Sequence, residues 1–314
     1  MNILMVGHSG AGKTSFMAGM YNYLGDSKDG YGIRATKENQ KRQLTRMAKN
    51  LDRGIYPAGT DIQQVYNFWL TCNGKDVVPF NWMDYRGGIL LSDDPDEEDM
   101  NKFMEAIKRA DALVVFLDGQ KLAVNTKKWE FEYEILISCI ENSLDVEHVA
   151  VFPICFVITK CDLLPDGASF YGLKRFSTLF DQISDSKTVG GMLLRCAINK
   201  DSIVDPFFAL SYCLYYGTPN YIKRIEDAKK EAIQRASYHR PETLIGIIFG
   251  VGEQILKEVA DIVDLGWETE YEKTWSAEAD YERENANLEY LQSIAEDMKD
   301  KLVEWNEKEY IITF

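Results

Sequence analysis

The chain has 314 residues, of which 46% are hydrophobic and 12% aromatic, so it holds enough apolar material for a folded core. Its formal net charge of −15 disfavours nucleic acid or an anionic membrane as the main partner. Residues 37–53 are the one candidate for a local basic patch, and they are interpreted as a solvated helix face. The length suits one large α/β domain with an extension, or two small domains.

The cysteines and the hydropathy indicate a reduced, soluble protein. The six cysteines show no C-x-x-C spacing, and several lie in apolar runs, where a free thiol acts as a small hydrophobic side chain. The first expected strand begins at residue 2, which leaves no room for a signal peptide. Residues 244–256 are too few to span a bilayer. We therefore expect a cytoplasmic protein without a transmembrane segment.

Residues 7–14 read G-H-S-G-A-G-K-T, a full match to the pattern G-x-x-x-x-G-K-[ST]. The apolar residues 3–6 predict a strand before it, and residues 15–24 predict a helix after it. Glycines let successive backbone N–H groups turn toward one anion, and the helix N-terminus adds unpaired donors. Lys13 is expected to face the terminal phosphates of a nucleoside triphosphate rather than the core, and Thr14 to bind Mg²⁺. The expected phosphate-binding residues are Gly7, Ser9, Gly10, Ala11, Gly12, Lys13, Thr14 and Ser15.

A polar helix and a β-hairpin are predicted next. Residues 35–51 form a helical pattern with a narrow apolar stripe, and residues 53–60 form a loop marked by glycine and proline. Strands are expected at residues 64–72 and 77–83. The Asn73-Gly74 pair between them is typical of a tight hairpin turn.

Strands and helices alternate along the rest of the domain. Helices are expected at residues 100–109, 129–142, 173–183 and 241–259, and strands at 112–117, 149–159 and 207–211, with 192–197 as a rival to the last. Such alternation implies a mostly parallel sheet covered on both faces, to which the hairpin adds one antiparallel strand. Ligands bind such sheets at the carboxyl ends of the strands, where the phosphate loop, Asp84 and Asp162 all fall.

Residues 266–314 differ in character, with 14 acidic and 5 basic residues. A 3-4-3-4-3 spacing of apolar residues predicts a helical seam, which packs on its own domain or contacts a partner; its members are Leu288, Leu291, Ala295, Met298, Leu302 and Trp305. We expect one domain at residues 1–262, with a helical insert at about 35–53, and an acidic helical extension at 263–314.

Two segments carry candidate ligands for a metal ion and a γ-phosphate. Asp84 ends a hydrophobic strand, and a carboxylate there can hold the Mg²⁺ shell, usually through water. Gly87 can place its N–H on a γ-phosphate without a side chain in the way. Thr60 lies in the loop before the hairpin and can bind both groups, with Thr36 as its rival.

The sequence Thr159-Lys160-Cys161-Asp162 predicts which nucleobase the protein binds. A carboxylate can accept hydrogen bonds from both the ring N–H and the exocyclic amine of guanine. Adenine offers no such donor pair, so Asp162 favours guanine. The aliphatic stem of Lys160 can lie along the plane of the base.

In this order the motifs resemble those of P-loop GTPases of the translation-factor and Ras-like class. The helical insert and the Asp-Tyr-x-Gly-Gly loop at residues 84–88 are similar to the bacterial double-GTPase group, which is associated with conflict or defence systems. The resemblance implies a three-layer fold with a mostly parallel six-stranded sheet, bound Mg²⁺ and GTP or GDP, and Lys13, Thr60 and Gly87 in catalysis. Thr14, Thr60 and Asp84 are the implied metal ligands. Ser211 is the implied fifth guanine contact through residues 209–211, with Cys196-Ala197 as the rival.

Gly88 stands where Ras-like members carry a glutamine that orients the attacking water. Because phosphoryl transfer depends on positioning, we expect slow hydrolysis by a GTP switch that presents its loops to a protein effector. One alternative is a GTP-binding scaffold or sensor with negligible hydrolysis. Another is a P-loop ATPase in which residues 159–162 match by accident.

Overall fold

A computed structural model describes residues 1–25, 30–57, 64–84, 97–124, 127–142, 144, 151–165, 168–198, 207–239 and 311–313. The chain divides into two compact units, one comprising Met1–Asn220 with Leu291–Phe314 and the other Tyr221–Tyr290. The predicted boundary at residues 262 and 263, the predicted helix at 241–259 and the predicted seam at 288–305 lie outside the described residues.

One mixed sheet organises the first unit, in the order β2-β3-β4-β1-β5-β6-β7-β8. Strands β1, β4, β5, β6 and β7 pair in parallel, β3 is antiparallel to β2 and β4, and β8 is antiparallel to β7. The predicted mostly parallel sheet is confirmed, but the predicted count of six strands is wrong, because β2 and β8 extend its two edges. The strands are β1 Asn2–Val6, β2 Tyr31–Ala35, β3 Gln64–Cys72, β4 Lys75–Asp84, β5 Ala112–Asp118, β6 Phe152–Thr159, β7 Val189–Arg195 and β8 Ile311–Thr313.

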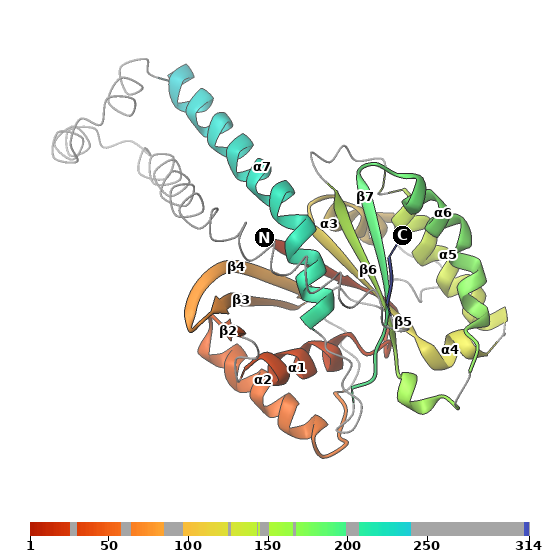
Figure 1. Ribbon diagram of the computed structural model, residues 1–314. Coiled ribbons are helices and arrows are strands. Elements are labelled where there is room, and N and C mark those ends of the chain that lie inside the picture. Colours follow the sequence, from red (N-terminus) through yellow and green to blue (C-terminus); the bar gives the residue numbers. More distant parts are fainter. Residues whose placement is uncertain are drawn as a thin grey trace. The chain divides into compact units, whose positions relative to one another are not determined.

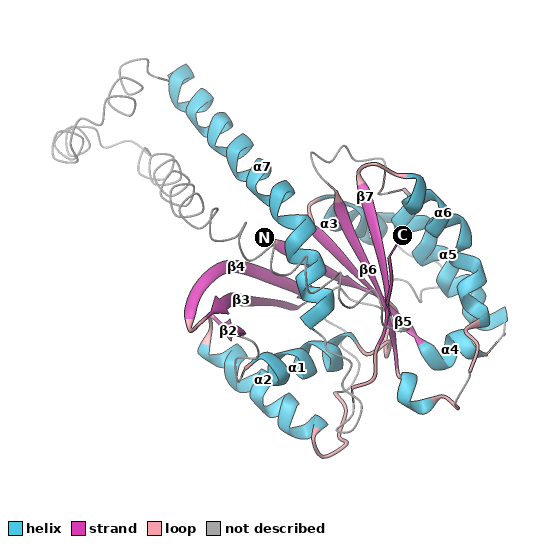
Figure 2. Ribbon diagram, in the orientation of Figure 1, coloured by secondary structure: helices cyan, strands magenta, loops and turns pink. Residues whose placement is uncertain are grey.

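Helices flank the sheet on both faces, as Figures 1 and 2 show. Helices α1 and α2 lie together on one side, and α3 to α6 lie on the other. The helices are α1 Lys13–Leu24, α2 Glu38–Leu51, α3 Glu97–Lys108, α4 Gly119–Ala123, α5 Lys127–Glu141, α6 Ser177–Asp185 and α7 Phe207–His239, with short 3₁₀ helices at Cys161–Leu163 (η2) and Tyr171–Phe176 (η3).

Alternate residues of the central strands supply two hydrophobic layers. On the side of α3, α5 and α6, one buried cluster joins Leu4 and Val6 of β1 to residues of β5, β6 and these helices. On the side of α1, the Phe16 ring stacks on Trp82 and meets Phe116 edge to face. Every residue of β5 and β6 is buried, and the two strands pair with each other inside the sheet.

The predicted strand at residues 207–211 is wrong, because these residues form the first turns of α7. The strand after η3 and α6 is instead β7, Val189–Arg195, which overlaps the rival range 192–197. The Phe207–Leu214 run is apolar because this part of the helix is buried. A short buried apolar run does not distinguish helix from strand by its periodicity.

The predicted hairpin is confirmed. Asn73 and Gly74 both take positive φ angles, +49° and +78°, which a tight turn of the favoured hand requires. The second strand therefore begins at Lys75 and runs to Asp84, longer than its apolar core suggested.

Candidate functional site: a phosphate cradle joined to a purine-recognition motif

The glycine-rich loop connects the end of β1 at Val6 to the start of α1 at Lys13. Gly7, Gly10 and Gly12 have φ angles of +143°, +77° and +89°, which L side chains rarely adopt. A Cβ atom on Gly7 would also lie 2.6 Å from the backbone oxygen of Phe116. Glycine at these positions therefore permits the loop to curve around an anion at the helix N-terminus.

The Lys13 ammonium lies inside this loop. It donates hydrogen bonds to the carbonyl oxygens of Gly7 (2.8 Å) and His8 (3.3 Å), and the residue is 7% exposed. Burial lowers the pKa of Lys13, and the Asp84 carboxylate opposes that shift. Two loop carbonyls thus hold the ammonium in this structure, and Lys13 lines the cavity beside the loop. Its contact with the terminal phosphates stays a prediction.

The Thr14 hydroxyl donates a hydrogen bond to Asp84 Oδ2 over 3.0 Å, and both residues are buried. Asp84 reaches this position because β4 pairs in parallel with β1, with Asp84 opposite Met5. A hydroxyl and a carboxylate beside a phosphate cradle are hard oxygen ligands of the kind that Mg²⁺ prefers. The donor set at this point therefore fits Mg²⁺.

Thr159 joins the second motif to the cradle. Its hydroxyl points to the carbonyl oxygens of Ala11 (2.8 Å) and Leu117 (3.2 Å), and it is buried at the end of β6. An added Cβ on Gly12 would lie only 3.4 Å from the Thr159 side chain. Thr159, the first residue of the Thr159–Asp162 segment, thus holds the phosphate loop in position.

Lys160 takes a left-handed φ of +58° directly after β6, which turns the chain sharply at the rim of the sheet. Its ammonium donates to Asp118 Oδ2 over 2.5 Å. Asp118 is itself fixed, because its other oxygen caps α4 by accepting from the N–H groups of Gln120 (3.0 Å) and Lys121 (3.3 Å). The stem of Lys160 is therefore held in place along the rim.

One cavity of about 310 Å³ brings the two motifs together. Asp162, exposed in η2, lines the same cavity as the phosphate loop. The volume lies at the lower end of the range of small-molecule sites. The cavity is lined by Ser9, Gly10, Ala11, Gly12, Lys13, Thr14, Ser15, Tyr56, Pro57, Thr159, Lys160, Asp162, Leu163 and Ile198.

Four lining residues were missed from the sequence: Tyr56, Pro57, Leu163 and Ile198. Tyr56 and Leu163 are large apolar side chains that remain 54% and 56% exposed, which is the signal that they lack a partner in the fold. Of these two residues, only Tyr56 had a recognisable signal in the sequence, because it stands in a Tyr-Pro pair shortly before Thr60.

Ser211 does not line this cavity. It is buried in α7. The rival segment lies beside the base motif instead, since the Cys161 N–H donates to the Cys196 carbonyl (3.3 Å) and the Cys196 N–H donates to the Ile158 carbonyl (2.7 Å). The loop after β7 therefore lies beside the Thr159–Asp162 segment, and its residue Ile198 lines the cavity. A contact from this loop to guanine stays a prediction.

Three further predicted features lie outside the described residues: Thr60, Gly87 and Gly88. Thr36, the rival of Thr60, is exposed beyond the end of β2, where its hydroxyl donates to the Asn67 carbonyl (3.3 Å).

His8 lies behind the cradle, 2% exposed, with its ring edge-to-face on Tyr133. Burial lowers its pKa to about 3, and the nearby charges of Lys121 and Lys13 add to that shift. Neither ring nitrogen has a hydrogen-bond partner among the described residues, although Nδ1 lies 3.7 Å from Glu132 Oε2. His8 is therefore a neutral packing residue at neutral pH.

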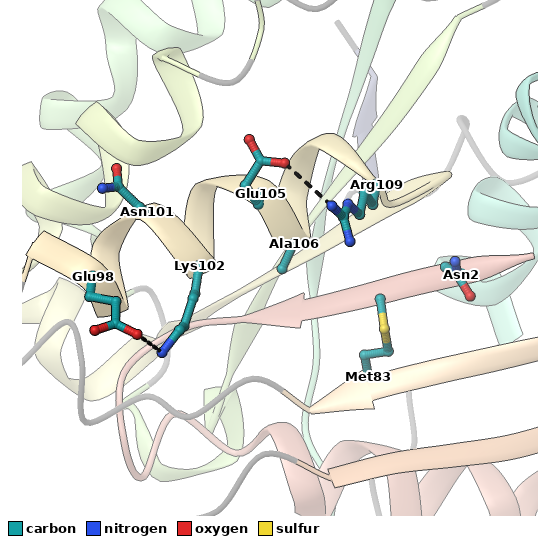
Figure 3. A pocket seen from close by; sticks show the side chains of 8 residues that line it. All are labelled: Asn2, Met83, Glu98, Asn101, Lys102, Glu105, Ala106 and Arg109. Atoms are coloured by element: carbon teal, nitrogen blue, oxygen red, sulfur yellow. Dashed lines mark ion pairs between the residues drawn. The ribbon is translucent and has the colours of Figure 1, made fainter.

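A second hollow, of about 880 Å³, lies between α3 and strands β1 and β4 (Figure 3). Its charged side chains pair along the helix, Lys102 with Glu98 (2.6 Å) and Arg109 with Glu105 (3.8 Å). None of the predicted site residues lines it. In the part of the chain that the structure describes, no helix is long and apolar enough to cross a bilayer.

Residues 4–150 match a family model described as Double-GTPase 1. No curated protein matches the sequence.

Several solved structures are similar to the chain at low identity. A bacterial selenocysteine-specific elongation factor, EF-Sec, is 12% identical over 63% of this chain and 25% of its own, with a TM-score of 0.32. The signal recognition particle receptor SRb-GTP/SRX complex from Chaetomium thermophilum is 11% identical over 64% and 92%, with a TM-score of 0.38. A GDP-bound NFeoB variant from S. thermophilus is 12% identical over 96% and 98%, with a TM-score of 0.35. The chain spans a quarter of the length of the elongation factor.

Proposed function

From the match of residues 4–150 to the Double-GTPase 1 family model, we infer that this protein is a P-loop GTPase of the double-GTPase group and a magnesium-dependent GTP-binding switch. It hydrolyses GTP to GDP slowly and presents its loops at residues 55–60 and 84–95 to a protein effector. The observation that carries this proposal is the single cavity that the phosphate loop and Asp162 share.

The phosphate loop binds the phosphates through its backbone N–H groups and the N-terminus of α1. Lys13 is already held in the loop by two carbonyl oxygens, so its ammonium needs only a small movement to contact a terminal phosphate. Thr14 and Asp84 would hold Mg²⁺, which neutralises phosphate charge when it is bound.

The base binds between the carboxylate of Asp162 and the stem of Lys160. Asp162 accepts from the ring N–H and the exocyclic amine of guanine. Lys160 lies along the ring because its ammonium is held by Asp118. Leu163 and Ile198 add apolar side chains to the lining of the cavity.

Catalysis is weak in this proposal because Gly88 has no side chain to orient water. The same residue favours the second candidate, a GTP-binding scaffold or sensor with negligible hydrolysis. Thr60 and Gly87 are proposed to contact the γ-phosphate, which would order their loops only while that phosphate exists.

Two measurements on the pure full-length protein test the proposal. In the first, GTP and ATP compete with a fluorescent guanine nucleotide in the presence of Mg²⁺. We expect GTP to displace the probe at concentrations at least about 100-fold lower than ATP, since Asp162 leaves adenine unpaired. Equal competition by ATP would instead reject the guanine preference and favour the alternative of a P-loop ATPase.

The second measurement is single-turnover hydrolysis of bound GTP. We expect GDP to form slowly but faster than in buffer. Formation of GDP at the buffer rate only, with binding intact, would reject the enzyme and leave the scaffold or sensor.

A further inference from the structure

The solvent face of α2 concentrates positive charge in an acidic protein. Between residues 37 and 53 there are six basic and two acidic residues, while the whole chain has 35 basic and 50 acidic ones. Residues 41, 42, 45, 46 and 49 are all exposed and share one side of the helix by their spacing. The basic residues are Lys37, Lys41, Arg42, Arg46, Lys49 and Arg53.

Five of these six cations have no ion pair among the described residues. Only Arg42 has an ion pair, with Glu38 over 3.5 Å on the same helix, and none of the other five has one within the described ranges. Several basic side chains elsewhere in the described chain are paired, such as Lys102 with Glu98, Lys121 with Glu132 and Lys160 with Asp118. The face therefore carries charge that the fold does not neutralise.

The opposite side of α2 already accounts for its packing. Leu44 and Ala48 are buried against the domain. Gln40 donates to the Val65 carbonyl (2.6 Å) and accepts from the Asn67 N–H (3.1 Å), which ties the helix to β3. None of the six basic side chains takes part in these packing contacts.

Two exposed hydrophobic residues follow the C-terminal end of α2 in the chain. Ile55 and Tyr56 are both 54% exposed, and Tyr56 continues into the wall of the nucleotide cavity. Unpaired cations beside an exposed aromatic residue form a surface that suits an anionic peptide with apolar side chains.

We propose that the solvent face of α2, together with Ile55 and Tyr56, is a docking surface for an acidic segment of a partner protein. A short peptide contacts the basic face alone. A nucleic acid duplex extends beyond this helix of 14 residues, and it therefore also meets the acidic remainder of the surface. Charge complementarity thus favours a peptide.

The test uses the full chain and a fluorescein-labelled peptide of alternating glutamate and tyrosine, with binding measured by fluorescence anisotropy. The variant Arg42→Glu/Arg46→Glu reverses two charges on the face. The control Lys174→Glu/Lys187→Glu makes the same change in net charge at two exposed lysines that lie outside α2. We expect the first variant to lose at least about tenfold in affinity and the control less than about twofold.

Equal losses in both variants, or no binding by the wild-type protein, would overturn the proposal. Tighter binding of a DNA oligonucleotide than of the peptide would overturn it in favour of nucleic acid. If circular dichroism shows that the first variant is unfolded, Lys41→Gln/Lys49→Gln replaces it. The neutral variant is expected to weaken binding by about threefold or more, and unchanged binding would count against the proposal.

Discussion

The hydroxyl of Thr14 donates to the carboxylate of Asp84 over 3.0 Å, which links the first turn of α1 to the end of β4. The two residues are 70 positions apart in the chain and meet because β1 and β4 are parallel neighbours. The contact places two hard oxygen ligands beside the phosphate loop, as a magnesium site requires.

Replacement of Asp84 by asparagine is expected to abolish the effect of Mg²⁺ on GTP affinity, because one anionic ligand is lost. The GTP affinity of the variant in Mg²⁺ should fall by about tenfold or more, toward that of wild-type protein in EDTA. Titration of a fluorescent GTP analogue with and without EDTA measures this. Asp76→Asn, an exposed change on the same strand, is the control, and an unchanged Mg²⁺ effect in Asp84→Asn would exclude this ligand.

Lys13→Ala should weaken GTP binding by at least about tenfold, because the phosphates lose a positive charge that the loop holds in place. Since Lys13 is buried and bonded to two carbonyls, the free energy of unfolding should also fall, by about 1 kcal/mol. Isothermal titration and urea denaturation measure the two effects. Lys37→Ala on the exposed start of α2 should change neither, and full GTP affinity in Lys13→Ala would contradict the cradle.

Thr159 offers a test that separates hydrogen bonding from shape. Thr159→Val keeps the volume but removes the donor to Ala11 and Leu117, so it should cost about 1–2 kcal/mol of stability and weaken GTP binding. Thr159→Asn, whose side-chain amide can still donate to a carbonyl oxygen, should retain most of both. A valine variant with wild-type affinity and stability would show that this link does not support the phosphate loop.

His8 predicts how stability depends on pH. Its pKa is lowered to about 3 in the folded protein from 6.5, so the unfolded chain binds a proton that the folded chain does not. The free energy of unfolding should therefore fall as the pH drops from 6.5 toward 3, and His8 contributes at most about 1.4 kcal/mol per pH unit. Urea denaturation of His8→Leu should show a shallower decline over this range, and an identical slope would mean that His8 is not the group responsible.

The sequence was a good guide wherever chemistry and local structure coincide. The glycine pattern at residues 7–14 requires the positive φ angles that Gly7, Gly10 and Gly12 adopt, and the Asn73-Gly74 pair specified its hairpin. The uninterrupted apolar runs of β5 and β6 also marked the centre of the sheet. At the glycine and Asn-Gly positions, the residue type is the one that accepts the positive φ angle that the turn needs.

Other features depend on tertiary contacts that no local pattern reveals. Strand β7 contains Gly190 and Gly191, which make its sequence less typical of a strand. The apolar residues at the start of α7, in contrast, resemble a short buried strand. The burial of Lys13 follows from two carbonyls that only the folded loop brings near it. The cavity-lining Ile198 was missed because its role comes from the position of β7 beside β6.

The central claim is that the phosphate loop and Asp162 bind one guanine nucleotide across their shared cavity. Its most direct test is the nucleotide preference of Asp162→Asn, measured by competition of GTP and xanthosine triphosphate for a fluorescent nucleotide. Xanthine carries an oxygen where guanine has its exocyclic amine, so an amide donor at residue 162 should favour it.

We expect the variant to lose at least about tenfold in GTP affinity and to gain binding of xanthosine triphosphate, while Asp181→Asn on the exposed face of α6 keeps the wild-type preference. Unchanged GTP affinity in Asp162→Asn, with no gain for the xanthine nucleotide, would contradict the account.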